Sequence, residues 1–252
     1  MELDRYVLHL SYLGTNYSGW QIQENAKSIQ GAIMLALHSI LSSDITLMTG
    51  AGRTDTGVHA VNFFAHFDYH NKMNTCDLKY KLNRFLAKDI VIHSINSISK
   101  DFHARFSATS RKYEYWISTV KDPFLINRAY FFSKKLNLQI MNEASQKLVG
   151  KHNFSTFSKG TYDNPNCDVT MVNWIKSKNM LFFSIEADRF LYNMVRCIVG
   201  TLIDLGLGKI SLSQFDEIRY SGDRIQSGFS VPAEGLYLMN VNYPKSYNFE
   251  CI

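Results

Sequence analysis

The sequence has no long uninterrupted apolar run. Its most apolar stretch, residues 190–207, is broken by Asn193, Arg196 and Asp204, whereas a helix that spans a membrane needs about 18 or more apolar residues. The first residues alternate between polar and apolar and lack the basic segment and apolar core of a secretory signal peptide. The sequence therefore predicts a cytoplasmic protein with no membrane association.

Cysteine is scarce, and the four cysteines are far apart in the sequence. No CxxC pair exists, which excludes a structural zinc site of that type. Four cysteines in 252 residues are also too few for a disulfide framework. We expect reduced thiols, most of them in the core, at Cys76, Cys167, Cys197 and Cys251.

Histidine spacing gives no metal site either. His66 and His70 are four residues apart, and on a strand this spacing separates them by about 13 Å, too far to share a metal ion. We interpret His59 and His103 as structural residues that form hydrogen bonds. No metal and no cofactor is expected.

The chain has only a small excess of positive charge. The chain has 27 basic and 22 acidic residues, a formal net charge of +5, which permits a phosphate-rich partner without requiring one. An ordinary soluble protein with a slight excess of lysine fits this number equally well. The aromatic content of 13% includes enough side chains to fill a core and to stack on nucleic-acid bases.

No linker rich in proline, glycine or serine divides the chain, although both halves alternate strands and helices. Periodicity predicts strands at 5–12, 45–49, 63–69, 90–98, 110–119, 174–178, 181–187 and 236–241. It predicts helices at 29–41, 76–86, 138–148, 191–205 and 211–220, three of them capped by Ser28, Asn137 and Ser211. We therefore expect an α+β protein with two lobes, residues 1–106 and 107–252, joined by one continuous sheet or a tight interface.

Residues 50–60, GAGRTDTGVHA, form the most informative segment. Three glycines, Arg53, Asp55 and His59 occur within eleven residues between two predicted strands, an arrangement that presents polar side chains at the edge of a sheet. The alternative is a simple turn in which Asp55 bonds to backbone amides. The glycine spacing does not match a dinucleotide-binding loop, and no Lys followed by Ser or Thr comes directly after the glycines, as a phosphate-binding loop requires.

Two further clusters combine charge with apolar or aromatic residues. Arg196 lies within an apolar helix, so it needs a carboxylate or phosphate partner unless it extends along the surface to reach water. Residues 102–116 interleave Arg105, Arg111 and Lys112 with aromatic residues. This pattern suits nucleic acid, although an ordinary strand with one solvated face would show it too.

These motifs together resemble the tRNA pseudouridine synthase A family, which modifies the anticodon stem-loop. The resemblance covers nearly the whole chain and rests on GTNYSGWQIQ (14–23), SIQ (28–30), AGRTDTGVHA (51–60), DFHARFSATSRKYEYWI (101–117), FLYNMVRCIVGTL (190–202) and EGLYL (234–238). It implies two similar ferredoxin-like (RRM-like) lobes that share a mixed, mainly antiparallel sheet with a central cleft. It also implies a homodimer that binds tRNA and uses no nucleotide cofactor.

The resemblance further implies that uridine is isomerised to pseudouridine. In that reaction the N1–C1′ bond breaks, the base rotates, and a C5–C1′ bond forms. The implied site residues are Asp55 as the catalytic carboxylate, Arg196 as its basic partner, Tyr113 stacked on the target uracil, Leu236 lining the pocket, Arg53 in extrusion of the base, and Arg105 in binding of the substrate.

The residue types suit this chemistry on physical grounds. A carboxylate nucleophile divides one difficult step into two, and an aromatic face offsets part of the cost of flipping a base out of its stack. The sequence leaves open whether Asp55 attacks C1′ or C6, or whether a glycal forms. It also leaves open a tRNA-binding module without turnover and a related enzyme that acts on another RNA.

Overall fold

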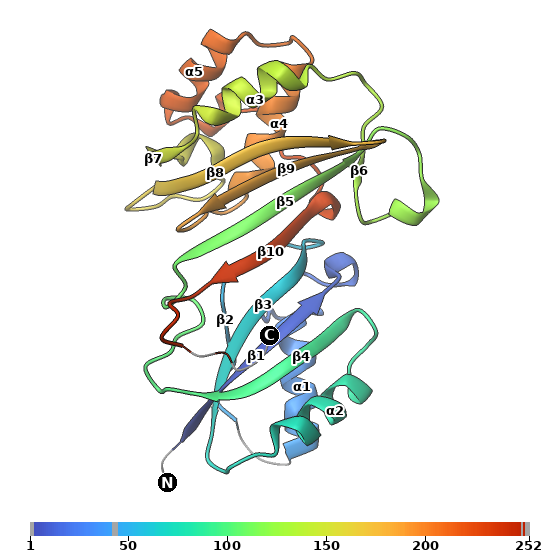
Figure 1. The fold of residues 1–252 in the computed structure, drawn as a ribbon, viewed down its shortest axis with the longest axis vertical. Helices are drawn as coiled ribbons and strands as arrows, with labels where there is room; N and C mark the ends of the chain where they lie inside the picture. The colour runs from blue at the N-terminus through green and yellow to red at the C-terminus, as the bar shows by residue number, and fades with distance from the viewer. Residues whose placement is uncertain (1–2, 42–44, 248, 250–252) are drawn as a thin grey trace. The chain divides into compact units, whose positions relative to one another are not determined.

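A computed structural model of the chain describes residues 3–41, 45–247 and 249. These residues form ten strands and five α-helices (Figure 1). The strand pairs within the two halves of the fold are antiparallel, except for one parallel pair between residues 117–118 and 130–131. The predicted α+β class with mixed, mainly antiparallel pairing is therefore confirmed. No helix within the described ranges has the length and apolar character that crossing a membrane requires.

The chain folds as two compact units. The first contains the described residues up to Thr109 and those from Leu238 onward, and the second contains Ser110–Tyr237. A division into 1–106 and 107–252 differs from this because it places the C-terminal segment in the second lobe. That segment returns to the first unit, where Asn62 Nδ2 donates to the Met239 carbonyl at 2.9 Å. Because Asn62 and Met239 are so far apart in the sequence, the local composition of either segment does not predict this contact.

The first unit alternates strands with helices. Its sheet has the order β4–β1–β3, with β2 beside β3. Its elements are β1 (Asp4–Tyr12), α1 (Ile29–Leu41), β2 (Thr49–Gly50), β3 (His59–Tyr69), α2 (Thr75–Phe85) and β4 (Ile90–Ile98), and β10 (Leu236–Asn242) contributes its residues from Leu238.

The two helices of this unit cover one face of its sheet (Figure 1). Leu8 and Leu10 alternate with His9 along β1 and are fully buried, because side chains two residues apart point to the same face of a strand. Helix α1 begins as predicted, since Ser28 Oγ accepts a hydrogen bond from the Gly31 amide at 3.1 Å.

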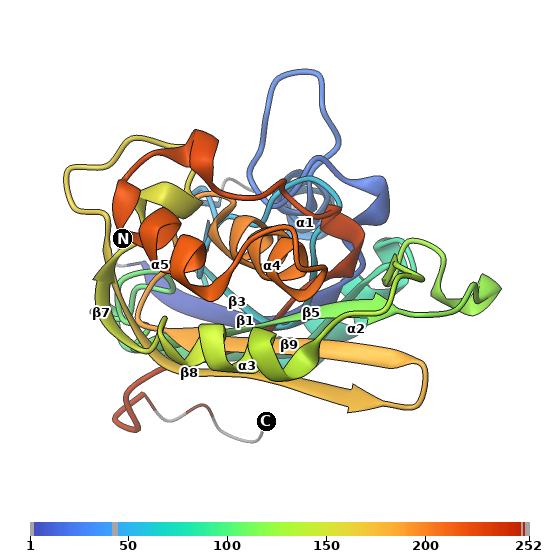
Figure 2. The same cartoon turned by 90° about the horizontal axis from the view of Figure 1, so that it is seen from above.

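In the second unit the strands pair in the order β5–β9–β8–β7, with β6 beside β5. Helix α3 contacts β8, and α3, α4 and α5 contact one another (Figure 2). The elements are β5 (Ser110–Ser118), β6 (Tyr130–Phe131), α3 (Leu138–Gln146), β7 (Gly150–Asn153), β8 (Asn166–Ser177), β9 (Met180–Ala187), α4 (Met194–Gly206) and α5 (Leu212–Ser221).

Several predicted elements differ from the structure. The strands predicted at 63–69 and 174–178 begin earlier, at His59 in β3 and at Asn166 in β8. The strand predicted at 45–49 is reduced to β2, because the Thr46 side chain bonds to the backbone of Asp68 in place of a regular ladder. The helix predicted from residue 191 begins at Met194, because Asn193 has a φ of 65°, in the left-handed region that interrupts a helix.

Candidate active site

The loop that carries Asp55 is held by the segment Gly14–Trp20. The Trp20 amide donates to the Thr54 carbonyl at 3.2 Å, and the Gly57 amide donates to the Tyr17 carbonyl at 3.3 Å. Backbone hydrogen bonds therefore fix the chain on both sides of Asp55.

Two glycines allow this close approach. A Cβ at Gly14 would lie 2.0 Å from the Val58 carbonyl oxygen, and a Cβ at Gly19 would lie 2.3 Å from the Thr54 carbonyl oxygen. Gly19 also has a φ of +82°, a conformation that costs other residues about 1–2 kcal/mol. The glycines at both ends of GTNYSG thus let one loop lie directly against the other.

We expect Gly19→Ala to destabilise the protein by about 2 kcal/mol or more, because the methyl group would meet a backbone carbonyl and strain φ. Gly52→Ala is the matched control, since a Cβ there has no neighbour within 4 Å. Chemical denaturation would measure both changes, and Gly52→Ala should stay within about 0.5 kcal/mol of the wild type. Equal stability of the two variants would contradict the close packing of the loops.

Aromatic side chains pack against the loop that carries Asp55. Trp20 is fully buried and its ring lies 4.2 Å from that of Phe63. The Tyr12 hydroxyl is hydrogen-bonded to Thr54 Oγ1 at 2.8 Å. Thr54, the neighbour of Asp55, is thereby anchored in the core.

Asp55 itself is half-buried, and Arg53 is exposed. The turn closes through the Asp55 backbone carbonyl, which accepts a hydrogen bond from the Val58 amide at 3.1 Å. The backbone of Asp55 therefore takes part in closing the turn. A half-buried carboxylate on a fixed backbone is suited to act on a bound substrate.

The histidines predicted to be structural do form hydrogen bonds. His59 Nδ1 accepts from the Gly14 amide at 3.0 Å, and His103 Nδ1 accepts from the amides of Arg105 and Phe106, each at 3.2 Å. No group of three or more metal-ligating side chains occurs in the described part of the chain.

In the second unit, Tyr113 lies on β5 opposite Ile185 of β9. Its half-buried ring meets that of Phe190 edge to face, with 5.0 Å between the ring centroids. Tyr115, two residues along the strand, points to the same face and is fully buried. The Tyr113 ring is therefore supported on one side by Phe190 and lies on a well-packed face of β5.

Arg196 is half-buried in α4, and its Nε donates to the Val231 carbonyl at 2.7 Å. A carbonyl carries no net charge, so this contact orients the guanidinium without neutralising it. Burial raises the pKa of the Tyr115 hydroxyl, and the positive charge of Arg196 acts on it in the opposite direction. The Tyr115 hydroxyl donates to the Pro232 carbonyl at 2.7 Å, next to the Val231 carbonyl that Arg196 contacts, so Arg196 lies close to Tyr115.

Leu236 is buried at the start of β10, next to the middle of β5. A Cβ at Gly235 would lie 2.8 Å from the Trp116 carbonyl oxygen, so the chain passes very close to β5 here. The Tyr237 ring stacks on that of Trp116 at 4.2 Å. Because adjacent residues point to opposite faces, Leu236 points to the face of Tyr115.

Tyr113, Arg196 and Leu236 all belong to the second unit. Asp55 and Arg53 lie in the first unit, as does Arg105, which is exposed in the loop before β5. That Asp55 and Arg196 form a pair stays a prediction.

Comparison with known proteins settles the family. A family model described as tRNA pseudouridine synthase matches residues 144–244. The tRNA pseudouridine synthase A of Bacteroides fragilis is 44% identical over 249 residues, which is 97% of this chain and 98% of that protein. The tRNA pseudouridine synthase A of Bacteroides thetaiotaomicron is 42% identical over 248 residues, 96% of this chain and 92% of that protein. The chain belongs to the tRNA pseudouridine synthase A family. The family resemblance seen in its motifs is therefore confirmed.

Two contacts of this family member were not predicted from its sequence. Phe190 supports the Tyr113 ring, and the Val231 carbonyl orients Arg196. Phe190 belongs to the same FLYNMVR motif as Arg196 and could have been found there. The Val231 carbonyl could not, because any residue type supplies a backbone oxygen.

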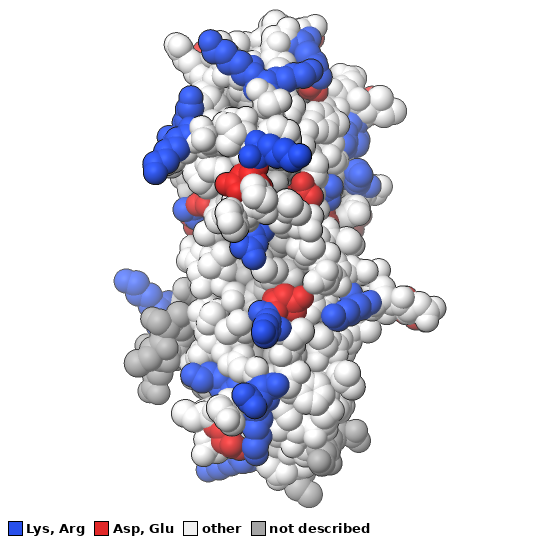
Figure 3. Space-filling model, turned by 90° about the vertical axis from the view of Figure 1, so that its right-hand side faces the viewer, with Lys and Arg blue, Asp and Glu red and all other residues white. Residues whose placement is uncertain are grey.

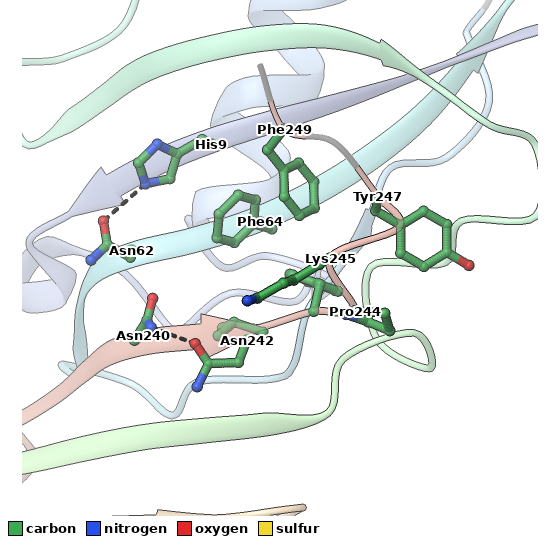
Figure 4. A pocket seen from close by; sticks show the side chains of 11 residues that line it. His9, Asn62, Phe64, Asn240, Asn242, Pro244, Lys245, Tyr247 and Phe249 are labelled. Carbon is green, nitrogen blue, oxygen red and sulfur yellow. Dashed lines mark hydrogen bonds between the residues drawn. The ribbon is translucent and has the colours of Figure 1, made fainter. Parts of the chain in front are cut away.

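One pocket of the first unit is separate from all the predicted site residues. It encloses about 480 Å³ and is lined in part by His9, Asn62, Phe64 and Lys245 (Figure 4). His9 Nε2 is hydrogen-bonded to Asn62 Oδ1 at 2.9 Å, and burial lowers the pKa of the imidazole. The synthase motifs contribute nothing to its lining.

We expect Tyr113→Ala to reduce kcat/KM for tRNA about 5- to 150-fold, because one base loses a stacking partner. Tyr113→Phe should retain most of the stacking and lose only what the hydroxyl contributes. Tyr80→Ala, at an exposed position on α2, is the control. Steady-state kinetics that are the same for Tyr113→Ala and the wild type would make Tyr113 a packing residue only.

Proposed function

We propose that the protein is a tRNA pseudouridine synthase that converts uridine to pseudouridine in the anticodon stem-loop. The observation that carries this proposal is the half-buried Asp55, presented on a loop that two glycine contacts hold in place. Family membership over nearly the full chain supports it. The relatives carry this activity in their names, and the present chain has the carboxylate that the chemistry needs.

The reaction is an isomerisation within one nucleotide. The N1–C1′ bond breaks, the uracil rotates, and C5 bonds to C1′. The proton on C5 is lost to solvent, and N1 acquires a proton. Asp55 acts by attack on C1′ or C6, or by proton abstraction that gives a glycal, and each of these routes uses the same carboxylate.

The other site residues have supporting roles in this proposal. Tyr113 stacks on the extruded uracil, and Leu236 lines the apolar side of the pocket. Arg196 favours the ionised form of Asp55, because an opposite charge offsets the cost of desolvation. Arg53, exposed beside Asp55, assists extrusion of the base.

Binding of tRNA rests on positive charge outside the reacting centre. Figure 3 shows a face over which Lys and Arg side chains are spread, with fewer Asp and Glu side chains. Together with the net charge of +5, this face suits the phosphates of an RNA. Arg105 is one of the basic residues we assign to this binding.

Release of tritium from C5 of labelled uridine in tRNA tests the proposed activity. The expected result is stoichiometric release with one labelled tRNA and none with the same tRNA already modified. Tight binding without release would favour the tRNA-binding module that lacks turnover. Release from another RNA but not from tRNA would favour the enzyme with a different substrate.

We further propose that the protein acts as a homodimer, because two copies would double the basic surface available to one tRNA. Light scattering should give twice the chain mass of 29.0 kDa. Filter binding should show tRNA affinity that falls steeply between low and moderate salt. The reason is that protein binding releases cations from the RNA phosphates, and added salt opposes this release. Full activity from a monomer would contradict the dimer, and affinity that does not vary with salt would contradict the electrostatic binding.

A further inference from the structure

The segment from Phe102 to Thr109 presents one aromatic side chain to solvent. Phe106 is 76% exposed, whereas Phe102, four residues earlier, is fully buried. Single exposed apolar residues are common and need no special explanation. What distinguishes Phe106 is the support that its ring receives from the protein.

The support is a second ring held in a fixed orientation. The His103 imidazole stacks on Phe106 with ring centroids 4.3 Å apart and planes 29° from parallel. His103 Nδ1 accepts two backbone amides, so its proton is on Nε2. Burial and the positive charge of Arg5 lower the pKa of His103, which keeps the supporting ring neutral.

The backbone of this segment is fixed as well. The Ala104 amide donates to His66 Nδ1 at 3.1 Å, and the Tyr243 hydroxyl donates to the Ala104 carbonyl at 2.6 Å. The His103 amide also donates a hydrogen bond to the Ser107 hydroxyl oxygen at 2.9 Å. Phe106 is therefore held in place before any ligand arrives, which reduces the entropy lost on binding.

A cation lies beside the exposed ring. The Arg105 guanidinium carbon is 5.6 Å from the centroid of the Phe106 ring. Residues next to Phe106 are exposed or half-buried and polar, namely Arg105 and Ser107. A protein partner would need a wider apolar patch, whereas a nucleobase needs one π-face and a cation for the adjoining phosphate.

We propose that Phe106 is a preformed stacking platform for one unpaired base of the RNA substrate, outside the reacting centre. This inference rests on the proposed function, since that function supplies the RNA. The platform accepts any base, because every base has a π-face, and it adds affinity without reading sequence.

The test compares three variants by filter binding of an unmodified tRNA transcript. Phe106→Leu keeps apolar area and removes the π-face, so its Kd should rise about 5- to 150-fold. Phe106→Trp should bind within about two-fold of the wild type. Phe124→Leu is the matched control, because Phe124 is 83% exposed and has no ring or cation contact within the described residues. The dependence of Kd on salt should be the same for all, since no phosphate contact is lost.

Several outcomes would overturn the platform. Wild-type affinity in Phe106→Leu would do so, as would equal weakening in Phe106→Leu and Phe106→Trp. A change of mass in light scattering with unchanged tRNA affinity would assign Phe106 to contact between copies of the chain. Absence of pseudouridine formation by the wild type, with binding still dependent on Phe106, would refute the proposed function and leave the platform standing.

Discussion

Asp55→Asn is expected to reduce pseudouridine formation below detection while tRNA binding persists. Asparagine keeps the shape of the side chain and removes the charged nucleophile, and Asp55 is the only acid in the loop 50–60. Binding should survive because it rests on basic and aromatic groups elsewhere. Tritium release from tRNA, filter binding and a melting curve would measure the three properties on one protein preparation.

The alternative role of Asp55 in the turn predicts a different pattern. If the carboxylate mainly stabilised the loop, the variant would lose stability first and activity only in proportion. The backbone bond between Asp55 and Val58 argues that the turn persists. Asp77→Asn, which breaks a surface ion pair with Lys81 on α2, is the control and should change little. More than a few per cent residual activity in a folded Asp55→Asn variant would rule out Asp55 as the nucleophile.

Arg196→Leu has the second-largest expected effect, a fall in kcat of about 100-fold or more. Leucine suits the apolar surroundings of α4, but under the proposed function it removes the positive charge that we assign to supporting the Asp55 carboxylate, at a cost of about 3 kcal/mol.

Arg196→Lys separates charge from geometry. It keeps the positive charge but loses the planar group whose Nε donates to the Val231 carbonyl, so we expect partial recovery of kcat. A melting curve should show both variants folded at the assay temperature. Unchanged kinetics in Arg196→Leu would mean that the side chain only extends along the helix surface.

Elements with strong local signals could be predicted from the sequence. Helix α1 and strand β4 have the predicted bounds, and α5 is shifted by one residue, because apolar periodicity and capping residues act within one turn or strand. Strands β6 and β7 were not predicted. They have two and four residues, and short strands exist only through partners that are distant in sequence.

The candidate site divides in the same way. Asp55 and Arg196 stand out in the sequence because each places a charge in an unusual setting. Tyr113 and Leu236 do not, since a strand contains many such residues, and only the family resemblance marks them. The ring that supports Tyr113, the carbonyl that orients Arg196 and the ring that supports Phe106 depend on packing, which no local pattern encodes.

The contact between Gly14–Trp20 and the loop 50–60 constrains which substitutions the protein can accept in evolution and in engineering. The shape of the Asp55 loop depends on two segments, 14–20 and 50–60, that are far apart in the chain. A substitution in one segment affects the other, because a side chain at Gly14 or Gly19 would displace the loop 50–60. A graft of the loop into a new scaffold would therefore have to carry both segments, and substitutions in one should be tolerated only alongside compensating changes in the other.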